Sequence, residues 1–466
     1  MGNNIIEIKN VTFAYQKDKI LKNVSLSVKE GSCILLCGES GCGKTSITKL
    51  INGLIPHFIA GEQFEGQVLI NGEKIANKKM YQLAKQVGSV FQNPKSQFFY
   101  MDSDSELTFA LENQGVPGEK IAEKADFVVK QLEIEDLVHR NLFTMSGGEK
   151  QLLAFASIYI SNPQIYVLDE PSSNLDITAM ERIRKQIQLI CQQGKTVIIA
   201  EHRLSYLADL VDYAIYLKDG KISRIFTGEA FRGLSKDRLS AMGLRNTEKV
   251  NIACKVQSTK QEILKHWDLQ IKELCVKKGG KTIFSHLNLG LNEGEIVGII
   301  GHNGVGKSTL LRCLCGLEKE SAGEIILYGK RIRPKERTKK IYMVMQDVNH
   351  QLFGESVGEE CKMLIEDDSE RDIETVLKEF DLLEEKERHP LSLSGGQKQR
   401  LVLATAVLGK RKILALDEPT SGLDYGHMTE VSRRLRMLAE QGYMILIVTH
   451  DIEFINDSCD RCFIIE

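Results

Sequence analysis

A glycine-rich stretch at residues 38–45, G-E-S-G-C-G-K-T, occurs a second time at residues 301–308 as G-H-N-G-V-G-K-S. Both stretches fit G-x-x-x-x-G-K-[S/T], a loop whose backbone N–H groups cradle phosphate oxygens. An apolar run precedes each loop and a helical pattern follows it, which is the context that such a loop requires. Two phosphate loops in one chain of 466 residues predict two α/β domains.

The rest of the chain repeats with the same period. Lys307 follows Lys44 by 263 residues, and three later features recur at a constant shift of 248 residues. These features are Ser-Gly-Gly at 146–148 and 394–396, Leu-Asp-Glu-Pro at 168–171 and 416–419, and the histidines His202 and His450. Fixed spacings of this kind indicate a repeat of one whole domain.

The pattern along each half alternates between strands and helices, which predicts a mainly parallel sheet. In the first half we expect strands at 5–13, 165–168 and 197–200, and helices at 146–159 and 178–191. Residues 228–268 lack a strong period. We therefore predict a first domain at 1–228, a linker at 229–268 and a second domain at 269–466 that is short at its C-terminus.

An acidic pair follows an apolar strand in both halves, as Asp169-Glu170 and Asp417-Glu418. An aspartate at that place can reach a phosphate-bound Mg²⁺, and the adjacent glutamate suits a general base for the attacking water. Such a pair is also common at helix N-termini. Its repetition downstream of a phosphate loop favours the metal and base roles.

A serine followed by two glycines opens a predicted helix in each half. The helix N-terminus and the small residues together suit an anion, although the same sequence is also an ordinary helix cap. Its recurrence strengthens the anion-site interpretation. The residues are Ser146, Gly147 and Gly148 in the first half and Ser394, Gly395 and Gly396 in the second.

Taken together, these motifs resemble those of the ATP-binding cassette family, the motor ATPases of ABC transporters. The resemblance covers nearly the whole chain, as two cassettes in tandem. It implies two P-loop NTPase domains, each with a mixed, mainly parallel sheet and a helical subdomain. It further implies that ATP and Mg²⁺ bind between the phosphate loop of one cassette and the Ser-Gly-Gly signature of the other, in a head-to-tail pseudo-dimer.

The resemblance also assigns roles to individual residues. Catalytic roles fall to Glu170, Glu418, His202, His450, Gln92 and Gln346. Mg²⁺ contacts fall to Thr45, Gln92, Asp169, Ser308, Gln346 and Asp417. ATP contacts outside the signatures fall to Tyr15, Gly38, Glu39, Ser40, Gly41, Cys42, Gly43, Lys44, Thr45, Gly301, His302, Asn303, Gly304, Val305, Gly306, Lys307, Ser308 and Thr309. Tyr15 would stack on adenine, whereas the matching position of the second cassette is Lys278. The residues 173–176 and 421–424 match the loop that communicates across the dimer.

The segment Q-N-P-K-S-Q at 92–97 looks like the Q-loop of energy-coupling-factor importer ATPases, which serve vitamins and metal ions. The second half keeps both glutamines, Gln346 and Gln351, but has Asp347-Val348 between them. The resemblance implies membrane-embedded scaffold and substrate-binding subunits as partners, and a peripheral place on the cytoplasmic face of the membrane. The chain has no apolar run long enough to span a bilayer and no signal-peptide pattern.

Two other kinds of tandem cassette protein remain as alternatives. A soluble protein that acts on ribosomes or nucleic acid would carry a long charged linker, an iron–sulfur domain or zinc modules, and a net charge near −2 gives no bulk attraction to nucleic acid. In a tandem sugar-importer ATPase one half is commonly degenerate, and here both halves keep their motifs. The 11 scattered cysteines favour buried thiols over disulfides or metal ligands.

Overall fold

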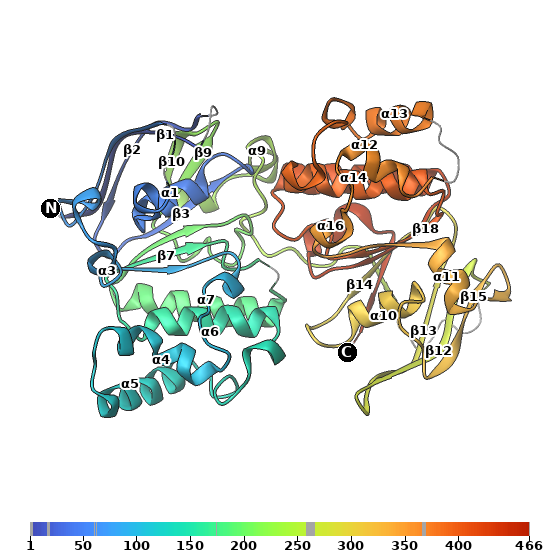
Figure 1. The fold of residues 1–466 in the computed structure, drawn as a ribbon, viewed down its shortest axis with the longest axis horizontal. Helices are drawn as coiled ribbons and strands as arrows, with labels where there is room; N and C mark the ends of the chain where they lie inside the picture. The colour runs from blue at the N-terminus through green and yellow to red at the C-terminus, as the bar shows by residue number, and fades with distance from the viewer. Residues whose placement is uncertain are drawn as a thin grey trace. The chain divides into compact units, whose positions relative to one another are not determined.

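The computed structural model describes residues 3–15, 19–59, 61, 63–173, 175–257, 266–365 and 370–465. The chain divides into two compact units. One is Met1–Lys249 with Asp424–Gly426, and the other is Val250–Leu423 with His427–Glu466. Each unit contains a six-stranded and a four-stranded sheet, with helices on the sheet faces (Figure 1). The α/β class with two phosphate-loop domains is thereby confirmed.

The six-stranded sheet of the first unit has the order β10-β9-β3-β8-β7-β6. Neighbours from β9 to β6 pair in parallel, and β10 pairs antiparallel with β9. Its strands are β3 (Cys33–Gly38), β6 (Val87–Val90), β7 (Ile165–Asp169), β8 (Thr196–Ala200), β9 (Tyr213–Lys218) and β10 (Lys221–Thr227). The strands expected at 165–168 and 197–200 are confirmed.

Strand β3, which leads into the first phosphate loop, is buried on both faces. Ile34 and Leu36 belong to one core, and Cys33, Leu35 and Cys37 belong to another on the opposite face. A parallel strand covered on both sides reads as an unbroken apolar run, because neither face meets water. The loop therefore begins from a rigid, fully packed strand.

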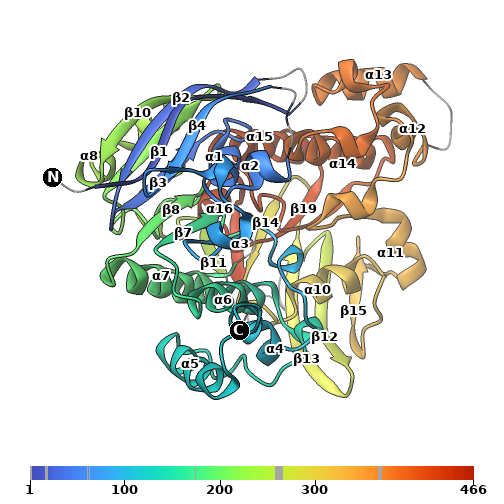
Figure 2. The same ribbon diagram turned by 60° about the vertical axis from the view of Figure 1, so that its left-hand side comes forward.

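The four-stranded sheet of the first unit is antiparallel in the order β2-β1-β4-β5, and it shares a core with α1 (Figure 2). Its strands are β1 (Asn4–Ala14), β2 (Lys19–Lys29), β4 (Gln63–Ile70) and β5 (Glu73–Lys74). The strand expected at 5–13 lies within β1.

Helices α6 and α7 run along one face of the six-stranded sheet, and α4 and α5 lie beyond α6 (Figure 1). The helices are α1 (Lys44–Ile51), α2 (Leu54–His57), α3 (Met80–Leu83), α4 (Ser103–Asn113), α5 (Gly118–Gln131), α6 (Gly147–Tyr159), α7 (Ile177–Gln192), α8 (Gly228–Arg232) and α9 (Lys236–Ala241). Both helices expected at 146–159 and 178–191 are confirmed, and α4 with α5 supplies the expected helical subdomain.

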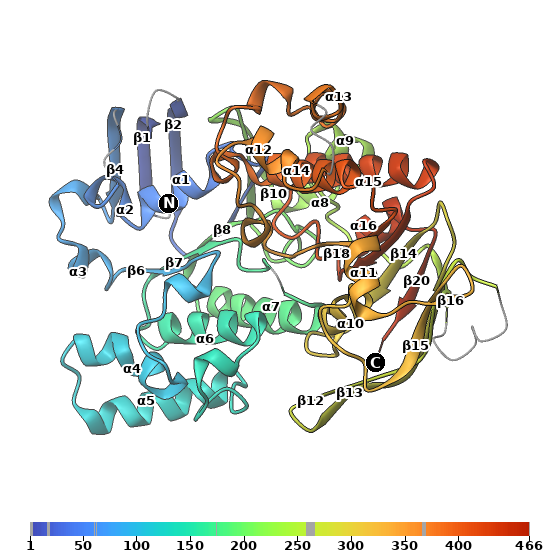
Figure 3. The same ribbon diagram turned by 45° about the vertical axis from the view of Figure 1, so that its right-hand side comes forward.

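The second unit repeats this plan, with sheets in the orders β11-β20-β14-β19-β18-β17 and β13-β12-β15-β16. The strands are β11 (Lys255–Gln257), β12 (Leu269–Lys278), β13 (Lys281–Leu291), β14 (Ile296–Ile300), β15 (Ala322–Leu327), β16 (Lys330–Arg331), β17 (Ile341–Val344), β18 (Ile413–Asp417), β19 (Met444–Val448) and β20 (Arg461–Ile464). Its helices α12 and α13 lie beyond α14, as α4 and α5 lie beyond α6 (Figure 3). The helices are α10 (Lys307–Leu314), α11 (Pro334–Lys340), α12 (Val357–Lys362), α13 (Glu370–Glu379), α14 (Gly395–Leu408), α15 (Tyr425–Glu440) and α16 (Ile452–Ser458).

The segment 229–268, predicted from sequence as a linker, contains regular structure. Helix α8 begins at Gly228, α9 follows, and β11 adds to the second unit's sheet by pairing in parallel with β20. Strand β11 takes the edge place in this sheet that β10 takes in the six-stranded sheet of the first unit. Residues 258–265 of this segment lie outside the described part of the chain.

All eleven cysteines are free thiols. Among the residues that the structure describes, no helix is long and apolar enough to cross a membrane.

Candidate ATP-binding and hydrolysis sites

The first phosphate loop joins β3 to α1. Gly43 caps α1 with a φ of 104°, where a Cβ atom would lie 2.6 Å from Cδ2 of Leu21, so glycine is required there. The buried Lys44 side chain crosses the loop, and its Nζ donates to the carbonyl oxygens of Gly38 and Glu39, each at 3.0 Å. The ammonium group is therefore held against the loop, where phosphate oxygens would meet it.

Asp169 ends β7 directly beside the first residues of α1. The Thr45 hydroxyl donates to its Oδ1 at 3.1 Å, and the Thr48 hydroxyl donates to its Oδ2 at 3.3 Å. Burial, followed by the charge of Glu170, raises the pKa of Asp169 to about 6. A buried carboxylate beside a hydroxyl is a donor set that Mg²⁺ prefers, and the cation would offset the cost of burying that charge.

Glu170 has a backbone φ of 46°, in the left-handed region, and its N–H donates to the Ala200 carbonyl at 2.8 Å. Its carboxylate meets both predicted partners. Gln92 Nε2 donates to Oε2 at 2.7 Å, and His202 Nε2 lies 3.4 Å from Oε1. The structure thus brings together the glutamate, the Q-loop glutamine and the histidine, although they are far apart in sequence. In this conformation the Gln92 amide is directed to Glu170.

The second phosphate loop repeats the geometry of the first. Gly306 has a φ of 102°, and Lys307 Nζ donates to the carbonyls of Gly301 at 2.6 Å and His302 at 2.9 Å. The matching acid, Asp417, accepts a hydrogen bond from Ser308, yet burial raises its pKa above the ordinary value. Both units therefore place a lysine, a hydroxyl and a buried aspartate around the loop.

The second glutamate, Glu418, also has a positive φ, of 48°, and is buried. His450 Nδ1 lies 2.6 Å from its Oε1, and the Thr449 hydroxyl donates to its Oε2 at 2.9 Å. The first unit has Glu201 in place of Thr449. The two glutamates are therefore held by different sets of neighbours.

Each signature serine caps its own helix. Ser146 and Glu149 form a capping box at the start of α6, and Ser394 and Gln397 form one at the start of α14. The Arg140 guanidinium donates to the Glu149 carboxylate at 2.6 Å, so an ion pair supports the capping box of α6. These caps fix the glycines of both signatures at helix N-termini, where the helix dipole favours an anion.

The second glutamine of each Q-loop is a backbone clamp. Gln97 accepts from the Phe91 N–H at 3.3 Å, and its amide donates to the Ala154 carbonyl at 3.5 Å. Gln351 accepts from the Met345 N–H at 2.6 Å and donates to the Met343 carbonyl at 2.6 Å. The shared five-residue spacing thus shapes the loop that carries Gln92 or Gln346.

The two predicted adenine positions differ. Tyr15 is 37% exposed and packs edge-on against Phe13 with ring centroids 4.8 Å apart, so one part of its ring is open. Lys49 Nζ lies 5.7 Å from the Tyr15 ring centroid. In the second unit Lys278 forms an ion pair with Glu318 at 3.4 Å.

Sequence reasoning missed three residues around the histidines. Glu201 precedes His202, is 2% exposed and accepts hydrogen bonds from four groups, while Thr449 and Asp451 flank His450 and are also buried. The sequence did contain an indication of Glu201, because this carboxylate directly follows the apolar strand at 197–200. A charge buried at that place needs hydrogen-bond or ionic partners, which marks the residue as structurally important. Asn174, in the loop predicted to communicate across the dimer, lies outside the described residues.

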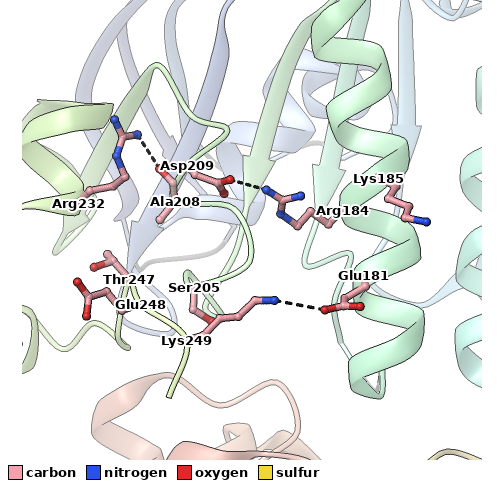
Figure 4. A pocket seen from close by; sticks show the side chains of 10 residues that line it. All are labelled: Glu181, Arg184, Lys185, Ser205, Ala208, Asp209, Arg232, Thr247, Glu248 and Lys249. Carbon is pink, nitrogen blue, oxygen red and sulfur yellow. Dashed lines mark hydrogen bonds and ion pairs between the residues drawn. The ribbon is translucent and has the colours of Figure 1, made fainter. Parts of the chain in front are cut away.

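A separate hollow of about 530 Å³ lies between α7 and the segment that follows α9 (Figure 4). Two ion pairs join residues that line it: Arg184 with Asp209, and Lys249 with Glu181 at 3.2 Å. Arg232 donates to the Ala208 carbonyl at 3.1 Å. None of the predicted site residues lines it.

Two phosphate loops, each with a buried aspartate and a glutamate held by a histidine, define an ATPase of the ATP-binding cassette class. A profile of the ABC transporter family matches residues 21–173 and 284–421, more than half of the chain. The chain belongs to that family as a tandem of two cassettes that bind and hydrolyse ATP.

Relatives span nearly the whole chain. A Treponema denticola protein, provisionally named an ABC transporter ATP-binding protein, is 44% identical over 99% of this chain and 95% of its own length. A Bacillus subtilis protein, provisionally named the HMP/thiamine import ATP-binding protein YkoD, is 30% identical over 99% of this chain and 90% of its own. A crystal structure of the archaeal ribosome recycling factor aABCE1 with the stalk protein aP1 matches 98% of this chain and 87% of that one, with a TM-score of 0.63 and 23% identity. That last likeness concerns the fold alone.

Proposed function

We propose that this protein is the ATP-hydrolysing subunit of an importer of the energy-coupling-factor type, for a vitamin, a metal ion or another small solute. The name of the Bacillus subtilis relative, which refers to HMP and thiamine import, supports this class. The Q-N-P-K-S-Q segment supports it as well. The protein would lie peripherally on the cytoplasmic face of the membrane and couple ATP hydrolysis to transport through separate scaffold and substrate-binding subunits.

The observation that carries the proposal is an apolar groove beside the first Q-loop. A hollow of about 530 Å³ lies among α3, β6, α4 and α6, and aromatic and aliphatic side chains line much of it. Tyr81 and Phe99, which are 62% and 76% exposed, stand at this groove. Exposed aromatic groups around a hollow are typical of a protein-docking site. A short amphipathic helix of a membrane scaffold subunit fits this surface.

Hydrogen bonds and a ring contact fix the exposed aromatic residue Phe99 at this groove. The buried Glu106 carboxylate accepts from the backbone N–H groups of Phe99 and Tyr100, at 2.8 and 2.9 Å. Phe99 also packs against Phe109 with ring centroids 4.8 Å apart. Gln97, whose side chain clamps the Q-loop, lines the same groove, so a docked helix would touch the loop that carries Gln92. This continuity gives a physical route from the membrane partner to the ATP site.

For hydrolysis in the first cassette, we propose that Lys44 neutralises the phosphates while Thr45 and Asp169 hold Mg²⁺, which supplies positive charge to the phosphate oxygens. Glu170 would accept a proton from the attacking water as that oxygen bonds to the γ-phosphorus and the bond to ADP breaks. His202 and Gln92 orient the Glu170 carboxylate.

In the second cassette, the matching groups are Lys307, Ser308, Asp417, Glu418 and His450, and we propose Gln346 as the Q-loop partner. Each ATP would be completed by the signature of the opposite cassette, Ser394 or Ser146. Both cassettes keep the full set of groups, and we propose that both hydrolyse ATP.

The catalytic assignment is tested with the double variant Glu170→Gln, Glu418→Gln. We expect it to bind ATP with a dissociation constant close to that of the natural chain and to lose turnover by a hundredfold or more, roughly the effect of removing a general base. Unchanged turnover would refute the assignment of both glutamates.

The docking assignment is tested by affinity capture from detergent-solubilised membranes of the source organism. The natural chain should recover a protein with several membrane spans, and Tyr81→Ser with Phe99→Ser should lose it. Phe127→Ser, which alters an exposed aromatic residue on α5, is the matched control and should retain it. Recovery of ribosomes by the natural chain would instead support the soluble tandem-cassette alternative.

A further inference from the structure

Glu201 is a buried carboxylate whose oxygens are all engaged by the loops around the first hydrolysis site. Its Oε1 accepts from the backbone N–H groups of His202 at 2.7 Å and Arg203 at 3.0 Å. Its Oε2 accepts from the Ser172 N–H at 3.2 Å and from the Tyr206 hydroxyl at 2.9 Å. Four donors on one charged group make strong hydrogen bonds, because a carboxylate accepts with its full charge in a medium of low dielectric constant.

These contacts join the loop that follows Glu170 to the loop that carries His202, and the reaction needs these two loops in a fixed relative position. Ser172 lies two residues after Glu170, and its N–H is bound by the same carboxylate that holds the backbone of His202. Arg203 adds a second tie, since its guanidinium donates to the Leu175 carbonyl at 3.3 Å. Burial, and then the Glu201 charge, raises the pKa of Tyr206 well above its ordinary value, so the phenol keeps the proton that it donates. Glu201 thus fixes where His202 stands relative to Glu170.

The second cassette joins the same two loops with an acid placed two residues further along the chain. Thr420, the equivalent of Ser172, donates through its hydroxyl to Oδ2 of Asp451 at 3.0 Å. Asp451 is the equivalent of Arg203, and its N–H donates to the Thr449 hydroxyl oxygen at 3.1 Å. Thr449, which replaces Glu201, donates to Glu418 at 2.9 Å. In each cassette, one carboxylate therefore links the loop after the proposed general base to the loop that carries the histidine. In sequence, this carboxylate precedes the histidine in the first cassette (Glu201) and follows it in the second (Asp451).

We propose that Glu201 is a positioning residue for ATP hydrolysis in the first cassette, and that Thr420, Thr449 and Asp451 together perform its task in the second. A carboxylate at position 201 cannot donate to Glu170 as Thr449 donates to Glu418, because an ionised carboxylate only accepts. In the first cassette, the Glu170 oxygens are met by Gln92 and His202. The proposal rests on the proposed roles of Glu170 and His202.

The test measures ATP turnover of the purified full chain and the binding of a fluorescent ATP analogue, with every variant made in a Glu418→Gln background so that only the first cassette hydrolyses ATP. Glu201→Gln introduces an amide N–H₂ group among four donors, so we expect kcat to fall roughly tenfold to a hundredfold, as for a misplaced catalytic group. The KM for ATP and the affinity for the analogue should change by less than about threefold, because the phosphate loop is untouched. The variant Glu170→Gln gives the kcat that remains when the first site is fully inactive, and the other variants are compared with that value.

Two further variants separate positioning from folding. Tyr206→Phe removes one of the four donors without changing the shape, and we expect kcat to fall by about twofold to fivefold. Tyr159→Phe is the matched control: its hydroxyl donates to Gln131 at 2.7 Å in the helical subdomain, and its loss should leave kcat unchanged. The exchange variant Ser172→Thr, Glu201→Thr, Arg203→Asp installs the arrangement of the second cassette and should restore kcat to within about threefold.

Suppose that Glu170→Gln abolishes turnover but Glu201→Gln leaves kcat unchanged. That result would overturn this inference and leave the proposed function intact. Equal losses of ATP affinity and kcat in Glu201→Gln would also overturn it, since they indicate a general structural role. If Glu170→Gln itself has no effect, the proposed function of the first site fails, and the inference fails with it.

Discussion

His450 Nδ1 lies 2.6 Å from Oε1 of Glu418, whereas in the first cassette it is Nε2 of His202 that approaches Glu170, at 3.4 Å. The two histidines therefore present opposite ring nitrogens to equivalent glutamates. Nε2 of His450 is buried and makes no hydrogen bond to any described residue. Leaving a buried nitrogen unsatisfied costs about 1–3 kcal/mol, so this atom has the capacity for one further hydrogen bond.

This difference predicts opposite responses to amide substitutions. A glutamine side chain carries its nitrogen near the place of Nε2, and asparagine carries its nitrogen near Nδ1. His202→Gln should therefore keep the contact with Glu170 and retain several-fold more ATP turnover than His202→Asn. His450→Asn should retain more turnover than His450→Gln, for the same reason. Steady-state hydrolysis measures both comparisons, with the His202 variants made in a Glu418→Gln background and the His450 variants in a Glu170→Gln background so that only the altered site hydrolyses ATP. The same ranking at both positions would contradict the prediction.

The adenine positions predict unequal nucleotide affinity. The open part of the Tyr15 ring is available for stacking, and an aromatic contact contributes about 0.5–1.5 kcal/mol, so Tyr15→Ala should weaken ATP binding in the first cassette by roughly threefold to tenfold. Lys278→Ala should change the affinity of the second cassette less, because Lys278 is paired with Glu318. Titration with a fluorescent ATP analogue resolves the two classes of site. Equal effects of the two substitutions would argue against stacking on Tyr15.

The contact between Thr45 and Asp169 predicts a specific dependence on Mg²⁺. Thr45→Ala removes a proposed ligand, so the Mg²⁺ concentration for half-maximal hydrolysis should rise on the order of tenfold, while removal of the cation with a chelator should abolish hydrolysis. Thr45→Ser is the control: the second cassette has Ser308 at this place, so the variant should behave like the natural chain. A Mg²⁺ requirement unchanged in Thr45→Ala would exclude the hydroxyl as a ligand.

The buried thiols predict an order of alkylation. The neighbouring Cys33 lowers the pKa of Cys191, which is partly accessible. Burial raises the pKa values of Cys37 and Cys315 to about 12. Since the thiolate is the reactive form, iodoacetamide at pH 8 should label Cys191 well before Cys37 and Cys315, whose labelling should require unfolding.

Peptide mass spectrometry after timed labelling reads out this order. In Cys33→Ala the influence of this thiol is lost, so the pKa of Cys191 should rise and its labelling should slow by a few-fold at the same pH. Rapid labelling of Cys37 in the folded chain would contradict the packing of β3 on both of its faces.

Much of each site could be predicted because its chemistry is local. The phosphate loop needs glycine at Gly43 and Gly306, where φ is near +100°, and a lysine and a hydroxyl directly after it. The Asp169-Glu170 pair sits at the end of a buried strand that its apolar run already indicates. Spacing therefore predicted both loops, both acids and both histidines before any contact between them was known.

Other features depend on contacts between residues that are distant in sequence. The segment after Gly228 has weak periodicity, and β11 becomes a strand because β20 offers an unpaired edge with which it can share hydrogen bonds. Gln97 and Gln351 looked like marks of a subfamily, yet each clamps the backbone of its own Q-loop.

The sequence by itself determined that this chain is a tandem of two ATP-binding cassettes, because the strand–loop–helix units and the acids that follow them are encoded at short, fixed spacings. Only the tertiary structure decided which groups contact Glu170 and Glu418, the two glutamates that we propose as general bases. Glu201 and Asp451 lie on opposite sides of equivalent histidines, and no spacing reveals which loop a buried carboxylate will bind. The physical reason is that a buried charge takes its partners from whichever backbone and side-chain donors the fold brings within hydrogen-bonding distance.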